Sequence, residues 1–148
     1  MKKGLAIALA MICVLGMFGC GKGIKYSDST VTEVNTYPNT SMVLFDDTIT
    51  LDLLTLKVTN QNDFRIESGN QFDFWLEELR DGKWQTIDVG ERDNTAEALS
   101  FYGEQLLQIS IASVYGELHS GHYRVVKCFW PETNSDNKFF LATEFDIA

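Results

Sequence analysis

Few residues in this chain have side chains that do chemistry near neutral pH. Its 148 residues include two histidines and three cysteines, and histidine is the side chain whose unperturbed pKa lies in that range. One short segment, "ELHSGH", places three possible metal ligands within six residues: Glu117, His119 and His122. A fourth ligand is not visible in the sequence, and structural zinc sites are almost always four-coordinate. We therefore expect a solvated polar loop here and no metal site.

Two acidic stretches could bind calcium, because carboxylate and amide oxygens are its preferred ligands. Neither stretch has the spacing of an EF-hand loop, and acidic loops of this kind are usually plain solvated surface. Calcium binding stays open as an alternative. The stretches are "LFDDTITLD", with Asp46, Asp47 and Asp52, and "ERDN", with Glu91, Asp93 and Asn94.

The residue types needed for catalysis are present, but not in suitable arrangements. Glu77 and Glu78 are adjacent in a predicted strand, so they point to opposite faces of a sheet and cannot act on one glycosidic bond. We find no glycine-rich phosphate loop and no Ser-His-Asp order in a suitable context. Cys128 has apolar neighbours and no base near it in sequence, so we expect a buried strand thiol and not a nucleophile. The sequence predicts a protein that is not an enzyme and has no cofactor.

The charge of the chain argues against one class of partner. Its formal net charge is -9, and its sequence pI is about 4.6. The phosphate backbone of a nucleic acid would repel such a protein, as would an anionic lipid surface. We therefore expect no nucleic-acid binding.

The first 19 residues have the anatomy of an export signal and are not expected to belong to the fold. Lys2 and Lys3 form a positive segment, and residues 5–15 form an apolar one. The ending "GMFGCGKG" resembles the lipobox of bacterial lipoproteins. That resemblance implies that Cys20 carries diacylglycerol through a thioether and becomes the first mature residue. The protein would then be anchored by lipid in the cell membrane and would face the outside.

An uncleaved membrane anchor is the alternative. Gly19 fits a lipobox, whereas Met17 and Phe18 depart from its usual leucine and small residue. Residues 4–21 carry no charge and are just long enough to be considered a spanning helix. Four glycines make them a poor one. Cleavage before Cys20 would remove two lysines and no acid, which changes the net charge from -9 to -11.

The sequence predicts three segments: a signal peptide over 1–19, a lipidated cysteine and flexible tether over 20–30, and one domain over 31–148. The tether sequence "GKGIKYSDST" offers little to bury, as is typical of flexible linkers. Cys13 would leave with the signal and Cys20 would carry lipid. Cys128 would then be the single thiol of the domain, so no disulfide could form within it.

The rest of the chain is a succession of short strands separated by turn signals. Their apolar residues alternate with period two, and Asp81-Gly82 is the clearest hairpin turn. Seven or eight such strands predict an all-β, immunoglobulin-like antiparallel β-sandwich without a disulfide. The segments are an edge strand over 29–37, a strand over 48–60 that changes face near Leu53, a hairpin over 71–88, and strands over 95–101, 104–113, 122–130 and 138–147.

Several of these segments together resemble the bacterial immunoglobulin-like domain of extracellular lipoproteins and membrane sensor proteins of Firmicutes. They are "LKVTNQND", "DGKW", "VYGELHSGHYRVVK" and "FFLATEFDI", and the resemblance covers residues 41–148. It implies a non-enzymatic module, usually of unassigned role. Tyr123, after Gly121, occupies the place of the tyrosine corner in such sandwiches, and Trp75 that of the buried strand-C tryptophan.

Loops at one end of a sandwich are its usual binding surface. In the immunoglobulin strand order, "NQNDFRIESGN" and "WPETNSDNK" lie together, and the start of the chain lies beside them. Aromatic and arginine side chains carry most binding energy at interfaces. We therefore predict a binding site formed by Phe64, Arg65, Trp130 and Asn134. Ordinary loop packing, with Phe64 and Trp130 capping the end of the core, stays open as the alternative.

Three functions are compatible with such a site. The first is a protein-binding or accessory module with an extracellular or envelope protein as partner. The second is a cell-wall or carbohydrate binder that stacks sugars on Trp84, Tyr102 or Trp130. The third is an inhibitor of an exported protease. The first is our prediction, and the other two are alternatives.

Overall fold

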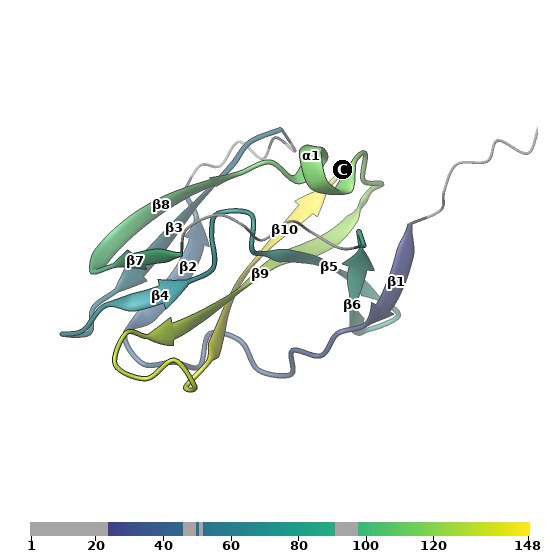
Figure 1. Ribbon diagram of the computed structural model, residues 1–148. Coiled ribbons are helices and arrows are strands. Elements are labelled where there is room, and N and C mark those ends of the chain that lie inside the picture. The colour runs from purple at the N-terminus through teal and green to yellow at the C-terminus, as the bar shows by residue number, and fades with distance from the viewer. Residues whose placement is uncertain (1–23, 46–49, 51, 91–97) are drawn as a thin grey trace, which may run out of the picture.

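The computed structural model describes residues 24–45, 50, 52–90 and 98–148. These residues form ten strands and one short helix, in two antiparallel sheets (Figure 1). Several predicted features lie outside the described residues: the signal peptide, Cys20, Asp46, Asp47 and the second acidic stretch with Glu91, Asp93 and Asn94.

The larger sheet is built around β9 (Gly121–Pro131), which is long enough to pair with three other strands. β10 (Phe139–Ile147) runs along one side of β9 over its whole length. β5 (Trp75–Arg80) and β4 (Ile66–Ser68) share the other side. The outer strands are β6 (Lys83–Asp88) and β1 (Lys25–Asp28) beyond β5, and β7 (Leu99–Phe101) beyond β4.

The smaller sheet contains β2 (Thr40–Leu44), β3 (Leu54–Asn60) and β8 (Gly103–Ile109), in that order. Tyr102 alone separates β7 from β8, so the chain passes from one sheet to the other at this point. The arrangement confirms the predicted all-β immunoglobulin-like sandwich. Cys128 is a free cysteine, and the described residues contain no disulfide.

The core lies between the two sheets and follows the alternation that the sequence predicts. Leu54, Leu56 and Val58 of β3 are buried, whereas the residues between them are half-buried. From the facing sheet, Val125 and Phe129 of β9 meet them in one continuous cluster. Alternate residues of a strand point to opposite faces, so period two identifies the core residues correctly.

The predicted edge strand over 29–37 is wrong. Strands lie on both sides of this segment, and residues 29–39 form a loop between β1 and β2. Val31 packs against Val126 and Ala142 in a small apolar cluster separate from the main core. Asn35 has φ of 59°, a left-handed conformation that asparagine tolerates and a strand does not use. That conformation ends any extended run before β2.

The side chain of Asn35 hydrogen-bonds to the backbone at the edge of β10, as a neighbouring strand would. Its Nδ2 donates to the Ala142 carbonyl oxygen at 3.0 Å, and its Oδ1 accepts from the Ala142 amide at 2.9 Å. The Asn35 amide also donates to the Phe140 carbonyl oxygen at 2.9 Å. The loop thus satisfies backbone groups that an open sheet edge would leave unpaired.

Strand β1 corrects the predicted tether. The segment Lys25–Asp28 pairs with β6 over four residue pairs, so the flexible tether does not extend over these residues. The sequence "KYSD" has no period-two pattern of apolar residues. Its pairing depends on partners distant in the chain, which explains why the sequence pattern did not indicate it.

The hairpin of β5 and β6 confirms the predicted turn at Asp81-Gly82. Both residues have positive φ, 50° and 76°, as a two-residue hairpin turn with the twist of a sheet requires. Trp75 differs from the prediction. It is half-buried and packs against the small apolar cluster that contains Val31. Its ring meets Phe140 edge-on, with ring centroids 5.8 Å apart. The main core instead receives its neighbour Leu76.

One helix was not predicted. α1 (Ile111–Tyr115) follows β8 and buries Ile111 and Tyr115. The side chain of Ser110 caps it by accepting from the Ser113 amide at 3.2 Å. Five residues are too few to show a helical period, and the alternation of β8 continues as far as Ile111. The sequence therefore predicts one longer strand.

Candidate functional site

The two predicted binding loops lie side by side. β4 pairs with the last residues of β9, and the Glu132 amide donates to the Arg65 carbonyl oxygen at 2.9 Å. We call residues 61–65 and 132–138 the loop end. In Figure 1 it lies at the lower left, whereas the described chain starts at the right with β1. The prediction that the start of the chain lies beside these loops is therefore wrong.

Phe64 and Arg65 hold the first loop in place. Phe64 is half-buried and packs against the main core. Arg65 Nε donates to Ser100 Oγ at 2.9 Å, and a terminal guanidinium nitrogen donates to the Ser100 carbonyl oxygen. The guanidinium also lies 5.2 Å from the centre of the Tyr102 ring. Both predicted binding residues thus have structural partners within the domain.

Asn134 is exposed and shapes the turn of the second loop. Its Oδ1 accepts from the Asp136 amide at 3.2 Å, and its amide donates to the Pro131 carbonyl oxygen at 3.0 Å. Asparagine side chains often stabilise turns in this way. Its side chain is therefore committed to the loop itself.

Of the four predicted binding residues, Trp130 borders a pocket at the loop end. It is half-buried near the end of β9, and its Nε1 donates to Glu67 Oε2 at 2.9 Å. The pocket has a volume of about 290 Å³ and is lined by Trp130, Ser135, Asp136 and Lys138. We call it the loop-end pocket.

Three lining residues of the loop-end pocket were missed by sequence reasoning. Ser135, Asp136 and Lys138 are exposed, and among the described residues neither Asp136 nor Lys138 forms an ion pair. The pocket offers an aromatic wall, a hydroxyl, a carboxylate and an ammonium group to a ligand. A signal was available, because short polar residues between two predicted strands belong to an exposed hairpin loop.

Tyr123 makes the bond that defines a tyrosine corner. Its hydroxyl donates to the His119 carbonyl oxygen at 2.8 Å, and burial raises its pKa to about 12. A Cβ on Gly121 would lie 3.0 Å from Cε2 of the tyrosine ring and 3.2 Å from Glu78 Oε1. The glycine therefore lets the chain pass close to the ring.

The possible zinc ligands do not converge. His119 Nε2 lies 3.0 Å from Glu78 Oε1, whereas His122 lies between Asp146 Oδ1 at 2.7 Å and Glu144 Oε2 at 2.9 Å. Those two carboxylates raise the pKa of His122, Asp146 more than Glu144. Glu117 is exposed. No group of three or more metal-ligating side chains occurs in the part of the chain that the structure describes.

Two of the rings proposed for sugar stacking already have partners. The Arg124 guanidinium lies 4.4 Å from the centre of the Trp84 ring, and the His122 ring lies 5.7 Å from it. Tyr102 has Arg65 on its ring. Trp130 is the proposed ring that borders the loop-end pocket.

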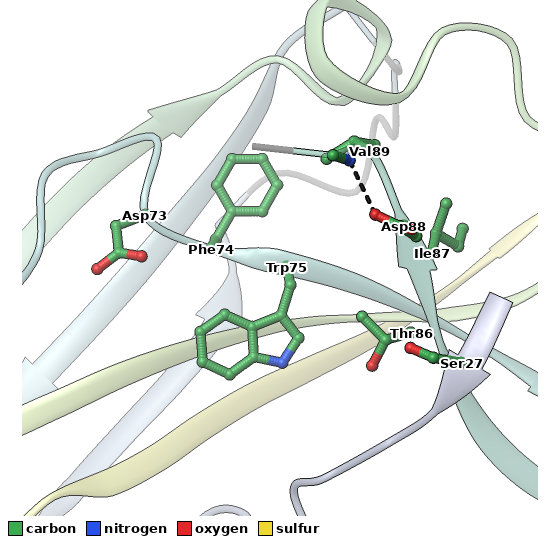
Figure 2. Close-up of a pocket in the computed structure, with 9 residues that line it drawn as sticks. Ser27, Asp73, Phe74, Trp75, Thr86, Ile87, Asp88 and Val89 are labelled. Atoms are coloured by element: carbon green, nitrogen blue, oxygen red, sulfur yellow. Dashed lines mark hydrogen bonds between the residues drawn. The ribbon is translucent and has the colours of Figure 1, made fainter. Parts of the chain in front are cut away.

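A second pocket of about 350 Å³ lies where β5 and β6 separate (Figure 2). Their pairing ends at Glu77 and Thr86, and Trp75 pairs with β9 instead. Asp88 Oδ1 already accepts from the Gly90 amide at 2.8 Å. The residues that line it are Ser27, Asp73, Phe74, Trp75, Thr86, Ile87, Asp88, Val89 and Gly90.

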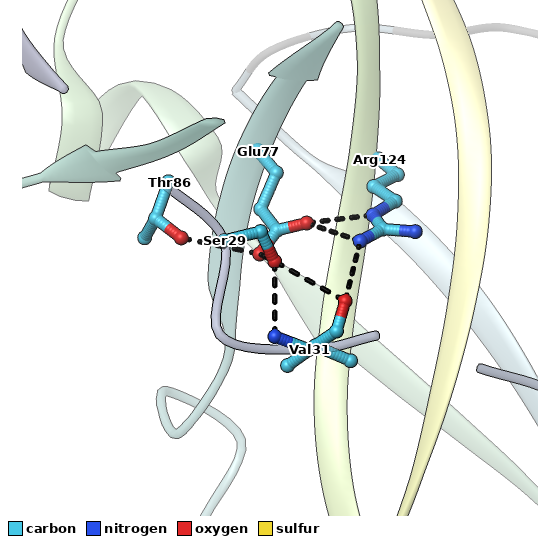
Figure 3. Close-up of polar contacts among 5 residues, drawn as sticks. All are labelled: Ser29, Val31, Glu77, Thr86 and Arg124. Atoms are coloured by element: carbon cyan, nitrogen blue, oxygen red, sulfur yellow. Dashed lines mark hydrogen bonds and ion pairs between the residues drawn. The ribbon is translucent and has the colours of Figure 1, made fainter. Parts of the chain in front are cut away.

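A buried ion pair lies on the outer face of the larger sheet (Figure 3). Arg124 Nε donates to Glu77 Oε2 at 2.7 Å, and a second guanidinium nitrogen lies 2.6 Å from the same oxygen. Ser29 Oγ and Thr86 Oγ1 donate to the other carboxylate oxygen at 2.6 Å and 3.1 Å. Arg124 also donates to the Val31 carbonyl oxygen at 3.4 Å. The pair therefore joins β5 and β9 to the loop after β1.

Lys127 is a second buried charge, on the inner face of β9. Its Nζ donates to three backbone carbonyl oxygens of the β4–β5 connection, those of Gly69, Asn70 and Asp73, at 3.3, 2.7 and 2.8 Å. Burial lowers its pKa to about 8. Cys128, the next residue, is half-buried, and burial raises the pKa of its thiol. A raised pKa disfavours the reactive thiolate.

The chain matches the family model described as a bacterial Ig-like domain over residues 36–146. The protein therefore belongs to the bacterial Ig-like domain family, which is generally a non-catalytic module. No curated protein and no solved structure matches it. Among the described residues, no helix is long and apolar enough to cross a membrane.

Proposed function

We propose that this protein is a non-catalytic binding or accessory module that recruits an envelope or extracellular protein at its loop end. The observation that carries the proposal is the loop-end pocket, where Trp130 meets Asp136 and Lys138, neither of which forms an ion pair with any residue that the structure describes. A tryptophan beside unpaired charges is the kind of surface that gives partners both binding energy and specificity. Membership of the bacterial Ig-like family supports a module of this class.

Lipid anchorage is part of the proposal. The lipobox-like ending before Cys20 supports a lipid anchor in the cell membrane, with the domain on the outer side. The acidic composition, with a net charge of -9, supports a protein partner over a nucleic acid.

Affinity capture from crosslinked intact cells tests this function. The full chain is compared with an Asp136→Asn/Lys138→Gln variant, because both side chains are exposed and lie away from the core. An Asp28→Asn/Lys83→Gln variant is the matched control, with the same chemical changes at exposed positions on β1 and β6. We expect one partner that is captured by the wild type and the control and lost with the loop-end variant. The same captured proteins from all three would contradict the proposal.

A carbohydrate or cell-wall ligand is the second candidate, favoured by the composition of the same pocket. A tryptophan wall with hydroxyl and charged groups suits a sugar ring. Retention on insoluble peptidoglycan tests it with Trp130→Leu and Trp130→Phe, because phenylalanine keeps an aromatic face and leucine does not. Retention lost in Trp130→Leu and kept in Trp130→Phe would favour the sugar. The exported-protease inhibitor stays a prediction of the sequence alone.

A further inference from the structure

We propose that the end of the domain around Ile24, Lys25, Val89 and Tyr115 rests against lipid headgroups, and that the loop end points away from the membrane. This inference rests on the proposed function, namely on lipid at Cys20. It assigns an interaction surface, and it reverses the orientation expected from the sequence, in which a short lipid tether beside the loops would aim the loop end toward the membrane.

The place where the chain leaves the domain is fixed by β1. All four residues of β1 pair with β6, from Lys25 opposite Asp88 to Asp28 opposite Gln85. Tyr26 Oη donates to Glu78 Oε2 at 2.7 Å, and the Arg80 guanidinium lies 4.2 Å from the centre of the tyrosine ring. Glu78 is itself buried, so breaking this bond would leave a buried carboxylate with a missing partner.

A second set of contacts holds the residues that follow β1 (Figure 3). Ser29 Oγ donates to the buried carboxylate of Glu77 at 2.6 Å, and the Ser29 amide donates to the Trp84 carbonyl oxygen at 3.1 Å. Arg124 reaches the Val31 carbonyl oxygen at 3.4 Å. The described chain therefore starts from one defined point on the domain.

The reach of the chain before that point is short. Four residues, 21–24, separate Cys20 from Lys25, so the two Cα atoms are at most roughly 18 Å apart. Through the strand pairing, Lys25 lies level with Val126, five residues before the end of β9, and three strands away from β9. A strand rises about 3.3 Å per residue and neighbouring strands lie about 4.8 Å apart, so Lys25 and the end of β9 are roughly 22 Å apart in the sheet. The extended tether is shorter than this distance, so it does not carry the lipid to the loop end.

The chemistry of the anchored end fits a lipid headgroup layer. A pocket of about 390 Å³ lies there, lined by residues that include Ile24, Lys25, Val89 and Tyr115. Ile24 is 37% exposed, and Lys25 is exposed. Asp88 is the carboxylate in this lining, and its Oδ1 accepts from the Gly90 amide.

Charge favours the same orientation. Lys22 and Lys25 lie on either side of Ile24, and basic residues next to an anchor are attracted to anionic lipids. The chain that remains after cleavage before Cys20 carries a net charge of -11, so an anionic surface would repel the rest of the domain. The two lysines next to the anchor therefore favour contact of this end with an anionic surface.

Headgroup quenching tests this orientation. The full chain is produced in bacteria, purified, checked by intact mass for lipid on Cys20, and reconstituted in phosphatidylcholine–phosphatidylglycerol vesicles with nitroxide-labelled headgroups. A Cys128→Ser background carries a fluorophore on Glu117→Cys, after α1, or on Ser135→Cys, at the loop end. We expect quenching several-fold stronger at position 117. Equal quenching, or stronger quenching at position 135, would overturn the orientation.

Weakening the side-chain contacts of Tyr26 and Ser29 provides a second readout. Tyr26→Phe/Ser29→Ala removes the hydrogen bonds from these side chains to Glu78 and Glu77, together with those between Ser29 Oγ and the Val31 backbone. The variant should reduce the difference in quenching between the two positions. Tyr102→Phe/Ser41→Ala makes the same chemical changes at exposed positions and should keep it. If the difference in quenching stays the same in Tyr26→Phe/Ser29→Ala, the role of β1 is contradicted. An intact mass without lipid, with no flotation on vesicles, would instead reject the anchorage on which the inference rests.

Discussion

At the scale of single residues, the structure buries charged side chains, whereas the sequence pattern indicated only which face of a strand each residue occupies. Glu77, Glu78, Arg124 and Lys127 are all buried. The alternation of strands predicts that Glu77 and Glu78 face opposite sides of a sheet, and they do have different partners: Arg124 and Ser29 for the first, Tyr26 and His119 for the second. Their burial depends on partners far apart in the chain, so no local pattern reveals it.

The Glu77–Arg124 pair leads to the first prediction. Arg124→Met leaves the buried carboxylate of Glu77 without its cation, so we expect a loss of about 3–5 kcal/mol in the free energy of unfolding. Glu77→Met/Arg124→Met removes both charges and should cost less than the single change. Urea unfolding measures both. Lys57→Met is the control, because its pair with Glu104 is exposed and should contribute about 0–1 kcal/mol. A loss in Arg124→Met no larger than in the control would contradict the account.

Lys127 leads to a second prediction, on pH dependence. Its pKa in the folded protein is lowered to about 8 from 10.5, so between these values the unfolded chain binds more protons than the folded one. The free energy of unfolding should therefore rise with pH across this window, by up to about 3 kcal/mol in total. Lys127→Met should lack this rise and should be less stable overall, because several carbonyl oxygens lose their donor.

The measurement is chemical unfolding of wild type and Lys127→Met from pH 7 to pH 10. Two tyrosines act in the opposite direction at higher pH. Burial raises the pKa of Tyr26 and Tyr123 to about 12, so their contribution to stability is lost as pH rises from 10 to 12. The difference between wild type and variant isolates Lys127 from this effect. Parallel pH curves for the two proteins would show that Lys127 does not titrate as described.

At the scale of elements, sequence reasoning succeeded where strands alternate and failed where single contacts decide. β10 and the β5–β6 hairpin follow from period two and from an Asp-Gly turn. β1 and α1 are too short for a period, and the loop over 29–39 is set by the left-handed Asn35 and its bonds to β10. Phe64, Arg65 and Asn134, three of the four predicted binding residues, make structural contacts within the domain. A count of aromatic and arginine residues does not reveal such contacts.

Asn35 leads to a prediction at this scale. Asn35→Gly keeps the positive φ but removes the side-chain bonds that cover the edge of β10, so we expect a stability loss of about 1–2 kcal/mol and self-association through the exposed edge. Asn39→Gly is the matched control, because Asn39 also has positive φ, 56°, and its side chain makes an exposed bond to Asn62. Light scattering after size-exclusion chromatography reports association. A strictly monomeric Asn35→Gly protein would contradict the protective role of the side chain.

At the scale of the whole molecule, the domain has two distinct ends. β1 and its contacts fix the end where the chain enters, and the loop-end pocket lies at the other. The sequence predicted the sandwich and the pairing of the two loops, but it placed the start of the chain beside them. That error follows from assigning the first strand to residues 29–37. The observed β1 lies beyond β6, at the opposite side of the sheet from the loops.

The central claim is that a protein partner is recruited at the loop end. Site-specific photocrosslinking in intact cells tests it most directly, with a photoreactive amino acid at Ser135 in the loop-end pocket or at Lys83 on the β5–β6 hairpin, both exposed. We predict a discrete crosslinked partner from position 135 that is absent from position 83. The same products from both positions, or a discrete partner from position 83 alone, would contradict the claim.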